Sequence, residues 1–204
     1  VHGRYFYPQA AGVGFSFNPY VWNEAIDPQA GVVRLVFGLG TRAVDRSDDD
    51  YTRIVALNVP EKRPETNFQA VRQYAQHRVD YLDLDANRLM SGDFEDVLAQ
   101  GRDLPVDMFA TDAAAYGETN DRNKAAPPVL TFDKLLRETS FVQDMRDILH
   151  TLQQAYNHPV DIEFTLNFIE EKQFCLHLVQ CRPLPVKGME TTLPSAIDIP
   201  GKNL

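Results

Sequence analysis

The stretch VDIEFTLNFIEEKQFCLHLVQCRP, residues 160–183, has the pattern of two β-strands joined by a tight polar turn. A four-residue turn at residues 170–173 is a common hairpin length. Side chains alternate between the two faces of a strand, so the turn decides which residues share a face. The pattern then predicts one polar face with four strong polar groups, Asp161, Glu163, Gln180 and Arg182.

In this register Asp161 lies opposite Arg182, and Glu163 lies opposite Gln180. The other face is predicted to pack on the core, and it carries Ile162, Phe164, Leu166 and Phe168 against Cys175, His177, Val179 and Cys181. The polar face has two interpretations. It is either a solvated face with one cross-strand ion pair, worth less than about 1 kcal/mol, or a binding face.

The binding interpretation follows from the chemistry of the four groups. Carboxylate and amide oxygens are hard ligands that suit Mg²⁺, which keeps waters and phosphate oxygens in its remaining positions. A planar guanidinium suits a phosphate group, which it can bind with two parallel hydrogen bonds. Phosphoryl transfer depends mostly on positioning and charge stabilisation, so a rigid pair of strands is a suitable support for it.

The composition limits the classes of protein to which this chain can belong. Its 204 residues, of which 44% are hydrophobic and 24% charged, predict a globular protein with a substantial core. The net charge of −9 argues against a nucleic-acid binder, and no apolar run approaches the roughly 18 residues that cross a membrane. Cys175 and Cys181 are too far apart along one strand to form a disulfide, and two reduced thiols predict a cytoplasmic protein.

The rest of the chain predicts a mixture of strands and helices. Strands are expected at residues 12–17, 31–40, 78–85 and in the run that ends at Pro60. The region 90–128 predicts one short helix near Phe94–Gln100 and long loops. A longer helix is expected over residues 140–156, where Ser140 and Gln143 form a capping box and the apolar face carries Val142, Met145, Ile148 or Leu149, Leu152 and Tyr156.

Several motifs resemble the ATP-binding domain of the pyruvate phosphate dikinase and phosphoenolpyruvate synthase family. VDIEFTL…LHLVQCRPLP is similar to the end of that domain, where a DIEF or DIEW strand returns as LLQxRP. GVGFSFNP is similar to the family's GVMFTxDP, and VFGLGTRAVDRSDDDY to its GLGExVVxGxxxPDxY. PVLTFDKLLRETSF also has the family's character. The resemblance covers about residues 12–183, with residues 78–128 matching only loosely.

The resemblance implies an α+β fold, in which a largely antiparallel sheet with packed helices forms the C-terminal subdomain of an ATP-grasp domain. The family uses ATP to phosphorylate a histidine on a separate mobile domain, which then delivers the phosphoryl group to pyruvate. The implied site residues are Glu163 and Gln180 as ligands of Mg²⁺ on ATP, Arg182 as a phosphate contact, Asp161 as the group that orients Arg182 or supports the metal, and Gly38 and Gly40 as nucleotide contacts.

The sequence departs from the family pattern in two respects. Thr41 stands where the family has a glutamate after Gly-Leu-Gly. The family's phosphate-binding lysine and arginine and its adenine hinge precede the strand similar to GVGFSF, so the first ATP-grasp subdomain is expected to be absent from this chain. Residues 1–187 are then the second subdomain and residues 188–204 a linker or tail. The alternative is a non-catalytic ATP-grasp remnant with a regulatory role, which Thr41 favours.

Other polar groups give weaker signals. Asp83, Asp85 and Asn87 have the spacing of a calcium loop, but Arg88 and Phe94 stand where such a loop needs glycine and glutamate. Gly-Leu-Gly alone is a weak phosphate signal, since a turn explains it equally well. Asp48, Asp49 and Asp50 could form a cation cluster, but a solvated turn is favoured. Surface or capping positions are predicted for His2, His77, His150 and His158.

Overall fold

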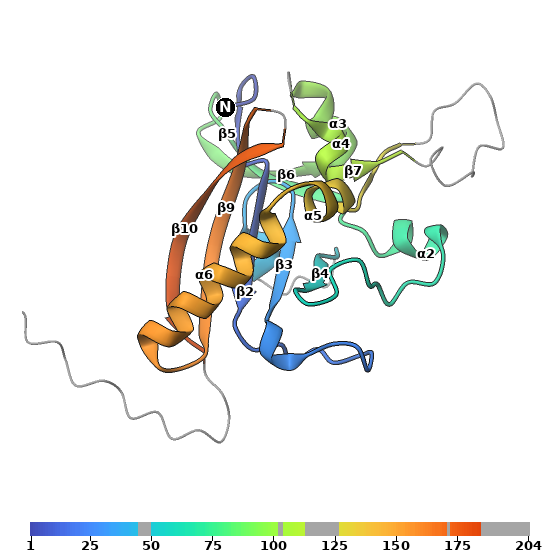
Figure 1. The fold of residues 1–204 in the computed structure, drawn as a ribbon. Helices are drawn as coiled ribbons and strands as arrows, with labels where there is room; N and C mark the ends of the chain where they lie inside the picture. The colour runs from blue at the N-terminus through green and yellow to red at the C-terminus, as the bar shows by residue number, and fades with distance from the viewer. Residues whose placement is uncertain (45–49, 102–103, 113–126, 171, 185–204) are drawn as a thin grey trace, which may run out of the picture.

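A computed structural model describes residues 1–44, 50–101, 104–112, 127–170 and 172–184 (Figure 1). Its main element is a five-stranded sheet in the order β10-β9-β2-β3-β4, in which every neighbouring pair is antiparallel. The strands are β2 (Ala10–Phe15), β3 (Val32–Val36), β4 (Arg53–Ala56), β9 (Val160–Glu170) and β10 (Gln173–Pro183). The predicted α+β class with a largely antiparallel sheet is confirmed.

Two smaller antiparallel sheets and a set of short helices accompany the main sheet. The smaller sheets are β1 (Tyr5–Phe6) with β5 (Arg78–Asp83) and β6 (Arg88–Asp93), and β7 (Ala110–Thr111) with β8 (Val129–Leu130). The helices are η1 (Pro28–Ala30), α1 (Thr41–Val44), α2 (Phe68–Gln73), α3 (Phe94–Gln100), α4 (Val106–Phe109), α5 (Asp133–Glu138) and α6 (Phe141–Tyr156). None of the helices in the described ranges has the length and apolar character that a membrane span requires.

The β9–β10 hairpin has the predicted register at its open end. Arg182 lies opposite Asp161, and Gln180 lies opposite Glu163. The turn is tighter than predicted, because Gln173 already pairs with Glu170. Lys172 adopts a left-handed φ of 63° in this turn, which is typical of two-residue hairpin loops.

A β-bulge in β10 changes which side chains face the core. The register shifts between Leu178 and Gln180, so Val179 is an extra residue in the ladder. The prediction is right for Ile162, Phe164, Leu166, Phe168 and Cys181, which belong to the core or pack on it. It is wrong for Cys175, His177 and Val179, because the shifted register turns Phe174 and Leu176 toward the core instead.

Helix α6 confirms the predicted long helix and covers one face of the main sheet. Figure 1 shows it lying across β9 and β2, and its packing contacts are with these two strands. Met145 and Leu149 are buried as predicted, and Phe141 is buried beside them. The ring of Phe141 lies with its centroid 6.0 Å from that of Phe164 on β9, so the helix and the hairpin share one core.

The predicted capping box at the start of α6 is wrong. Ser140 already has helical dihedral angles and makes no side-chain cap. Its hydroxyl donates instead to the carboxylate of Asp144, at 2.7 Å. The amide of Phe141 donates to Oγ1 of Thr139 at 3.2 Å, so the threonine takes over the capping role one residue earlier than expected.

The region from residue 90 to residue 128 contains more secondary structure than predicted. Helix α3 has the expected bounds, but β6, α4 and β7 replace parts of the expected loops. Their runs are too short to show a clear period in the sequence. The segment 113–126 lies outside the described residues.

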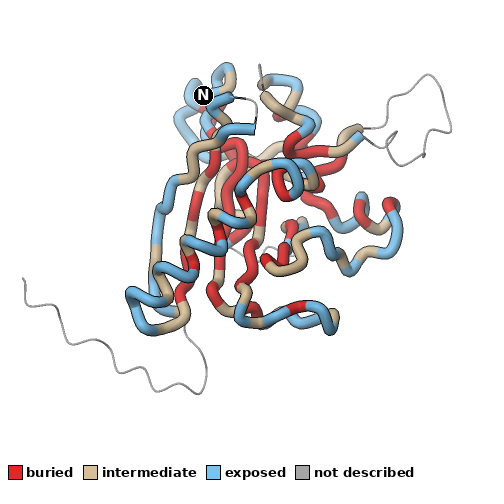
Figure 2. The backbone as a smooth tube through the Cα atoms, viewed as in Figure 1, coloured by how far each residue is buried: buried red, intermediate tan, exposed pale blue. Residues whose placement is uncertain are grey.

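The core lies between the main sheet, α6 and the smaller elements (Figure 2). In that view the buried segments follow the central strands, while the outer side of α6 and much of β10 are exposed. Aromatic rings join the layers, since the centroid of Phe37, after β3, lies 5.4 Å from that of Phe94 and 5.6 Å from that of Phe109. The small sheets are therefore part of the same core as the main sheet.

Tyr7 is a core residue whose hydroxyl is buried without a hydrogen-bond partner among the described residues. Burial raises the pKa of Tyr7 from 10 to about 12. Between pH 10 and about pH 12 the Tyr7 hydroxyl keeps its proton in the folded state, whereas it loses that proton in the unfolded chain. The corresponding stability is fully present below pH 10 and is lost as the pH rises toward 12.

Replacing Tyr7 with phenylalanine is expected to leave the free energy of unfolding at neutral pH unchanged or to raise it by up to about 1 kcal/mol, because it removes an unpaired buried hydroxyl. It should also reduce the loss of stability above pH 10. Urea unfolding at neutral and alkaline pH measures both effects. Tyr5→Phe is the control, since the Tyr5 hydroxyl accepts from Arg4 at 3.0 Å. A clear loss of stability for Tyr7→Phe at neutral pH would contradict the prediction.

Candidate functional site

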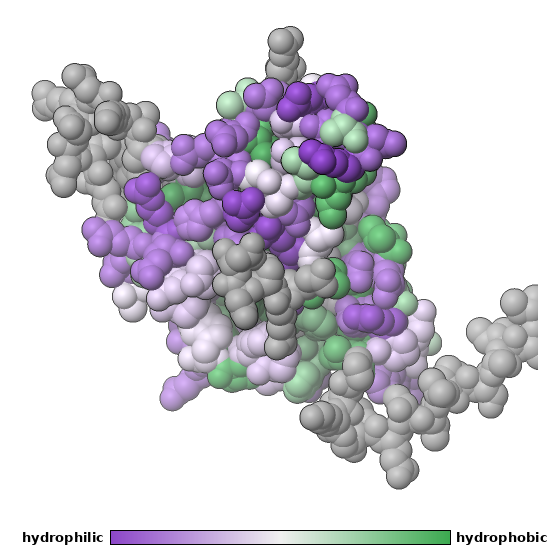
Figure 3. All heavy atoms as spheres, turned by 180° about the vertical axis from the view of Figure 1, so that it is seen from behind, coloured by the Kyte–Doolittle hydropathy of each residue, from purple (hydrophilic) through white to green (hydrophobic). Residues whose placement is uncertain are grey.

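The face of the main sheet opposite α6 carries the predicted polar groups. On β9, Asp161, Glu163 and Thr165 alternate with residues that face the α6 core. Figure 3 views the molecule from behind and shows hydrophilic side chains gathered over its upper part, away from the open end of the β9–β10 hairpin, which lies at the bottom of Figure 1. Helix α1 packs on the same face through a small apolar cluster of Ala11, Val13, Val36 and Ala43. The Gly-Leu-Gly turn is thereby placed on the polar side of the sheet.

A cavity of about 320 Å³ lies where β9 meets this turn. Glu163, Gly40 and Thr41 line it, together with Gly12, Leu39, Val44, Phe164, Thr165 and Val179. Glu163 is half-buried, and within the described part of the chain its carboxylate has no hydrogen-bond or ion-pair partner. The structure thus brings two of the predicted groups, Glu163 and Gly40, to one cavity.

Arg182 and Asp161 form an ion pair at the end of the hairpin. Nε and one terminal nitrogen of Arg182 both lie 2.9 Å from Oδ2 of Asp161. The aspartate side chain is only 6% exposed, whereas the arginine side chain is 56% exposed. The buried acid therefore fixes one edge of the guanidinium and leaves much of the arginine accessible to a ligand.

Gln180 and Gly38 lie outside the cavity lining, as do Asp161 and Arg182. Gln180 faces Glu163 in the ladder but is exposed, and the bulge residue Val179 lines the cavity in its place. Gly38 has a left-handed φ of 92°, and a Cβ atom there would lie 2.8 Å from the carbonyl oxygen of Asp80. Gly38 is therefore required by the turn. The nucleotide contacts of Gly38, Gly40 and Gln180 stay predictions.

A polar network that the sequence analysis missed holds the turn in place. Thr41 Oγ1 donates to Oδ2 of Asp80 at 2.6 Å, and Nε of Arg42 donates to Oδ1 of the same residue at 3.0 Å. Arg42 also pairs with Asp50 at 3.7 Å, and that carboxylate accepts from two backbone amides at 2.9 and 2.7 Å. These groups come from segments far apart in sequence, so only the fold reveals them.

The groups that gave weak signals have structural roles. Asp83 Oδ1 accepts from the amides of Asp85 and Ala86, both at 3.0 Å, and so shapes the β5–β6 turn. His150 contacts Gln154, and His158 contacts the carbonyl of Pro159. Asp48 and Asp49 lie outside the described residues, and the solvated position predicted for Asp50 is wrong, because its side chain is only 2% exposed and belongs to the network above. Cys175 and Cys181 are free thiols, as predicted.

The donor set of the polar face fits a magnesium ion that is bound together with a nucleotide. Glu163 and Gln180 offer hard oxygens from facing positions. No group of three His, Cys, Asp or Glu residues in the described ranges could hold a metal without further ligands. Mg²⁺ commonly takes only one or two protein ligands and completes its shell with waters and phosphate oxygens. Asp161 is already engaged by Arg182, which favours orienting that arginine over supporting the metal.

The chain thus forms an antiparallel α+β domain with an open polar face beside its Gly-Leu-Gly turn. The model of the family described as pyruvate phosphate dikinase, AMP/ATP-binding domain, matches residues 2–198, and the chain belongs to this family. No curated protein matches the chain. Membership confirms the family resemblance of the sequence and gives the domain an ATP-binding role of the pyruvate phosphate dikinase type, in a family of phosphotransferases.

Proposed function

We propose that this domain binds Mg-ATP on the polar face of its main sheet and supports phosphorylation of a histidine on a separate domain of the same protein. The phosphoryl group then passes to pyruvate or a related acceptor, as in phosphoenolpyruvate synthase. The observation that carries the proposal is the carboxylate of Glu163, which has no partner among the described residues and lies in one cavity with Gly40 and Thr41 of the segment similar to the family's Gly-Leu-Gly motif.

Each polar group has a role that its surroundings allow. Glu163 and Gln180 would hold Mg²⁺, which offsets the negative charge of the triphosphate in a chain of net charge −9. Arg182 would donate to a phosphate, and Asp161 would keep its guanidinium in place. Gly40 allows close approach of a ligand to the backbone beside Glu163. None of these roles needs a nucleophile, because this chemistry rests on positioning and charge stabilisation.

The family's ATP-grasp organisation gives the proposed place of this domain in the protein. Residues 1–187 would form the second of two subdomains that close on the nucleotide, and residues 188–204 would be a linker or tail. The first subdomain and the phosphohistidine domain would be other parts of the same cytoplasmic protein. The partner of this chain is then ATP, with no role for nucleic acid or membrane.

A second candidate function is a non-catalytic ATP-grasp remnant that acts as a regulatory module. The position of Thr41 favours it, because the hydroxyl donates to Asp80 at 2.6 Å and so takes a structural role where the family has a glutamate. A protein of this kind would keep the fold of the domain and lose phosphorylation. Formation of acid-labile phosphohistidine in the full-length protein decides between the two functions.

Calorimetry with Mg-ATP tests the binding role directly. Replacing Arg182 with methionine should weaken binding by about 10- to 100-fold, since a hydrogen bond to a charged group is worth about 1.5–3 kcal/mol. Asp161→Asn should weaken binding less, and the double variant should bind no more weakly than Arg182→Met alone. Arg137→Met is the control, because Arg137 is about as exposed as Arg182 and pairs with the exposed Glu61 at 3.2 Å, outside the proposed site. Unchanged affinity of Arg182→Met would remove this residue from the site.

A further inference from the structure

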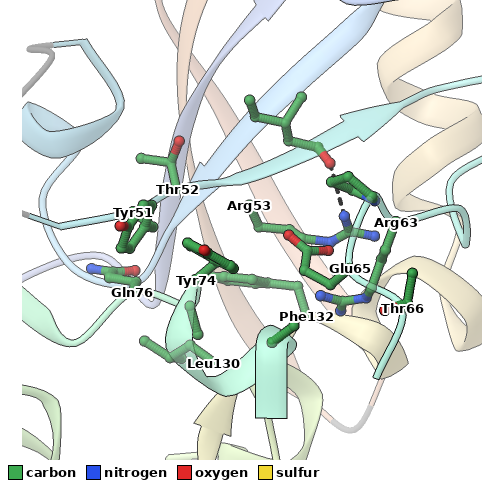
Figure 4. A pocket seen from close by; sticks show the side chains of 14 residues that line it. Tyr51, Thr52, Arg53, Arg63, Glu65, Thr66, Tyr74, Gln76, Leu130 and Phe132 are labelled. Atoms are coloured by element: carbon green, nitrogen blue, oxygen red, sulfur yellow. Dashed lines mark hydrogen bonds between the residues drawn. The ribbon is translucent and has the colours of Figure 1, made fainter. Parts of the chain in front are cut away.

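The two edges of the main sheet differ in how far the chain itself engages them. The edge strand β4 has four residues, and a cavity of about 460 Å³ lies beside it. Figure 4 shows Arg63 and Glu65, from the segment that follows β4, turned toward the same cavity as Arg53. Arg53 also donates to the carbonyls of Ile54 at 2.9 Å and Pro60 at 3.1 Å. Part of this edge is therefore already occupied by the chain.

Strand β10 forms the opposite edge and is open along its outer side. It has eleven residues, pairs with β9 alone in the described part of the chain, and is largely exposed in Figure 2. Such an edge presents a row of backbone N–H and C=O groups that can pair with another strand. Proteins often protect an edge with charged residues, proline or a bulge. Residues 174–178 contain no charged residue and no proline, so this part of the edge is unprotected.

Two irregularities limit the stretch of β10 that can accept a further strand. The ladder with β9 shifts between Gln173 and Phe174 and again between Leu178 and Gln180. The regular stretch between them, residues 174–178, is centred on Leu176. A second copy of the chain that pairs antiparallel to this stretch about a two-fold axis therefore places Leu176 on the axis.

Cys175 and His177 flank this axis with their side chains on the polar face, opposite Asn167 and Thr165 of β9. Sγ of Cys175 lies 3.6 Å from Nε2 of His177. Two ligands of one tetrahedral Zn²⁺, a sulfur at about 2.3 Å and a nitrogen at about 2.0 Å, lie about 3.5 Å apart. The pair thus has the spacing of half a zinc site. In the part of the chain that the structure describes, no third His, Cys, Asp or Glu completes it.

The two-fold pairing supplies the missing ligands. With Leu176 on the axis, Cys175 of each copy lies opposite His177 of the other, on the same face of the joined sheets. Cβ atoms of directly opposed residues lie about 4.5–5.5 Å apart, so two Cys–His pairs meet at one place. On the other face, Phe174 lies opposite the exposed Leu178 of the second copy, which adds an apolar contact. The register that the edge allows is therefore also the one that completes a tetrahedral site.

We propose that two copies of the chain pair through residues 174–178 and are bridged by one Zn²⁺, which Cys175 and His177 of both copies hold. Each thiol gives up its proton to solvent on binding, and each imidazole binds as the neutral form. The metal is required, because five paired residues a side bury far less than the roughly 1,200 Å² of a specific interface. The net charge of −9 on each copy also opposes association. The site does not depend on the proposed Mg-ATP role, since thiolate and imidazole suit Zn²⁺ whereas Mg²⁺ takes oxygen ligands.

Light scattering of the reduced 204-residue chain tests the proposal. The chain is expected to be a monomer in EDTA and to double its mass with Zn²⁺, at one zinc for every two chains, while Mg²⁺ has no effect. Co²⁺ in place of zinc should give the visible absorption of a tetrahedral site with a thiolate charge-transfer band. Cys175→Ser and His177→Gln should each abolish the dimer, because each removes two of the four ligands. Leu178→Lys keeps all four ligands but places a charge in the paired edge, and should weaken the dimer at least about tenfold.

Cys181→Ser and His150→Gln are the matched controls. Cys181 is the other free thiol and lies beyond the bulge, and His150 is exposed on α6. Both variants should dimerise with zinc as the wild-type chain does, and urea unfolding checks that every variant folds. The proposal is overturned if zinc leaves the chain monomeric, as for a hydrogen bond only between Cys175 and His177, or if the dimer persists in EDTA. Binding of one zinc to each single chain, or normal dimerisation of Leu178→Lys, overturns it as well.

Discussion

Replacing Glu163 with glutamine is expected to lower phosphohistidine formation in the full-length protein by about 100- to 1,000-fold, the usual effect of removing one group that stabilises transferring charge. The carboxylate lies in the cavity beside the Gly-Leu-Gly turn and has no described partner, so its charge is available to a ligand. Glutamine has nearly the same shape but no charge. Single-turnover formation of acid-labile phosphohistidine, measured with saturating Mg-ATP, reports the effect.

Folding should be almost unaffected by this substitution, because Glu163 makes no described hydrogen bond or ion pair. The thermal melting temperature of the Glu163→Gln variant is expected to match that of the wild-type chain. Glu170→Gln is the matched control, since Glu170 lies on the same strand but is exposed near the hairpin turn. Near-normal phosphorylation by Glu163→Gln, with the protein folded, would exclude a metal-binding role for this carboxylate.

The sequence predicts the hairpin well where polar and apolar residues alternate strictly. Asp161 and Glu163 are separated by Ile162, and this alternation fixes both the register and the face. On β10 the run around Leu178 and Val179 has two adjacent apolar residues, and either could face the core. The bulge resolves this ambiguity by tertiary packing, which an alternating pattern cannot encode. The wrong assignments on β10 follow from that single extra residue.

Long-range polar contacts could not be predicted for a different reason. No local pattern in the sequence relates Arg42 to Asp80, yet Nε of Arg42 donates to Oδ1 of Asp80 at 3.0 Å. The cavity that Arg53 and Glu65 line could not be predicted either, because no local pattern in the sequence distinguishes a buried arginine from an exposed one. Motifs identify residues whose chemistry is shared within a family, whereas these pairs depend on how separate segments are brought together.

Replacing Gly12 with alanine is expected to cost about 3 kcal/mol of unfolding free energy or more, which could unfold the domain. Gly12 lies in β2, the central strand of the main sheet, opposite Leu35 of β3 and Phe164 of β9. A Cβ atom at this position would overlap the backbone carbonyl of Arg34 and would also lie 2.9 Å from the ring of Phe164. A backbone carbonyl in a central strand cannot move aside without breaking the ladder.

Gly40→Ala provides the matched control for stability, because the same added methyl group would there meet only the side chain of Ala11 at 3.5 Å, an ordinary contact. Urea unfolding of both variants should therefore show a large loss for Gly12→Ala and little change for Gly40→Ala. The comparison separates steric overlap from the general effect of adding a methyl group to a glycine. Equal stability of the two variants would mean that β2 and β3 can separate locally at Gly12, and that the central ladder next to Glu163 is less rigid than phosphoryl transfer requires.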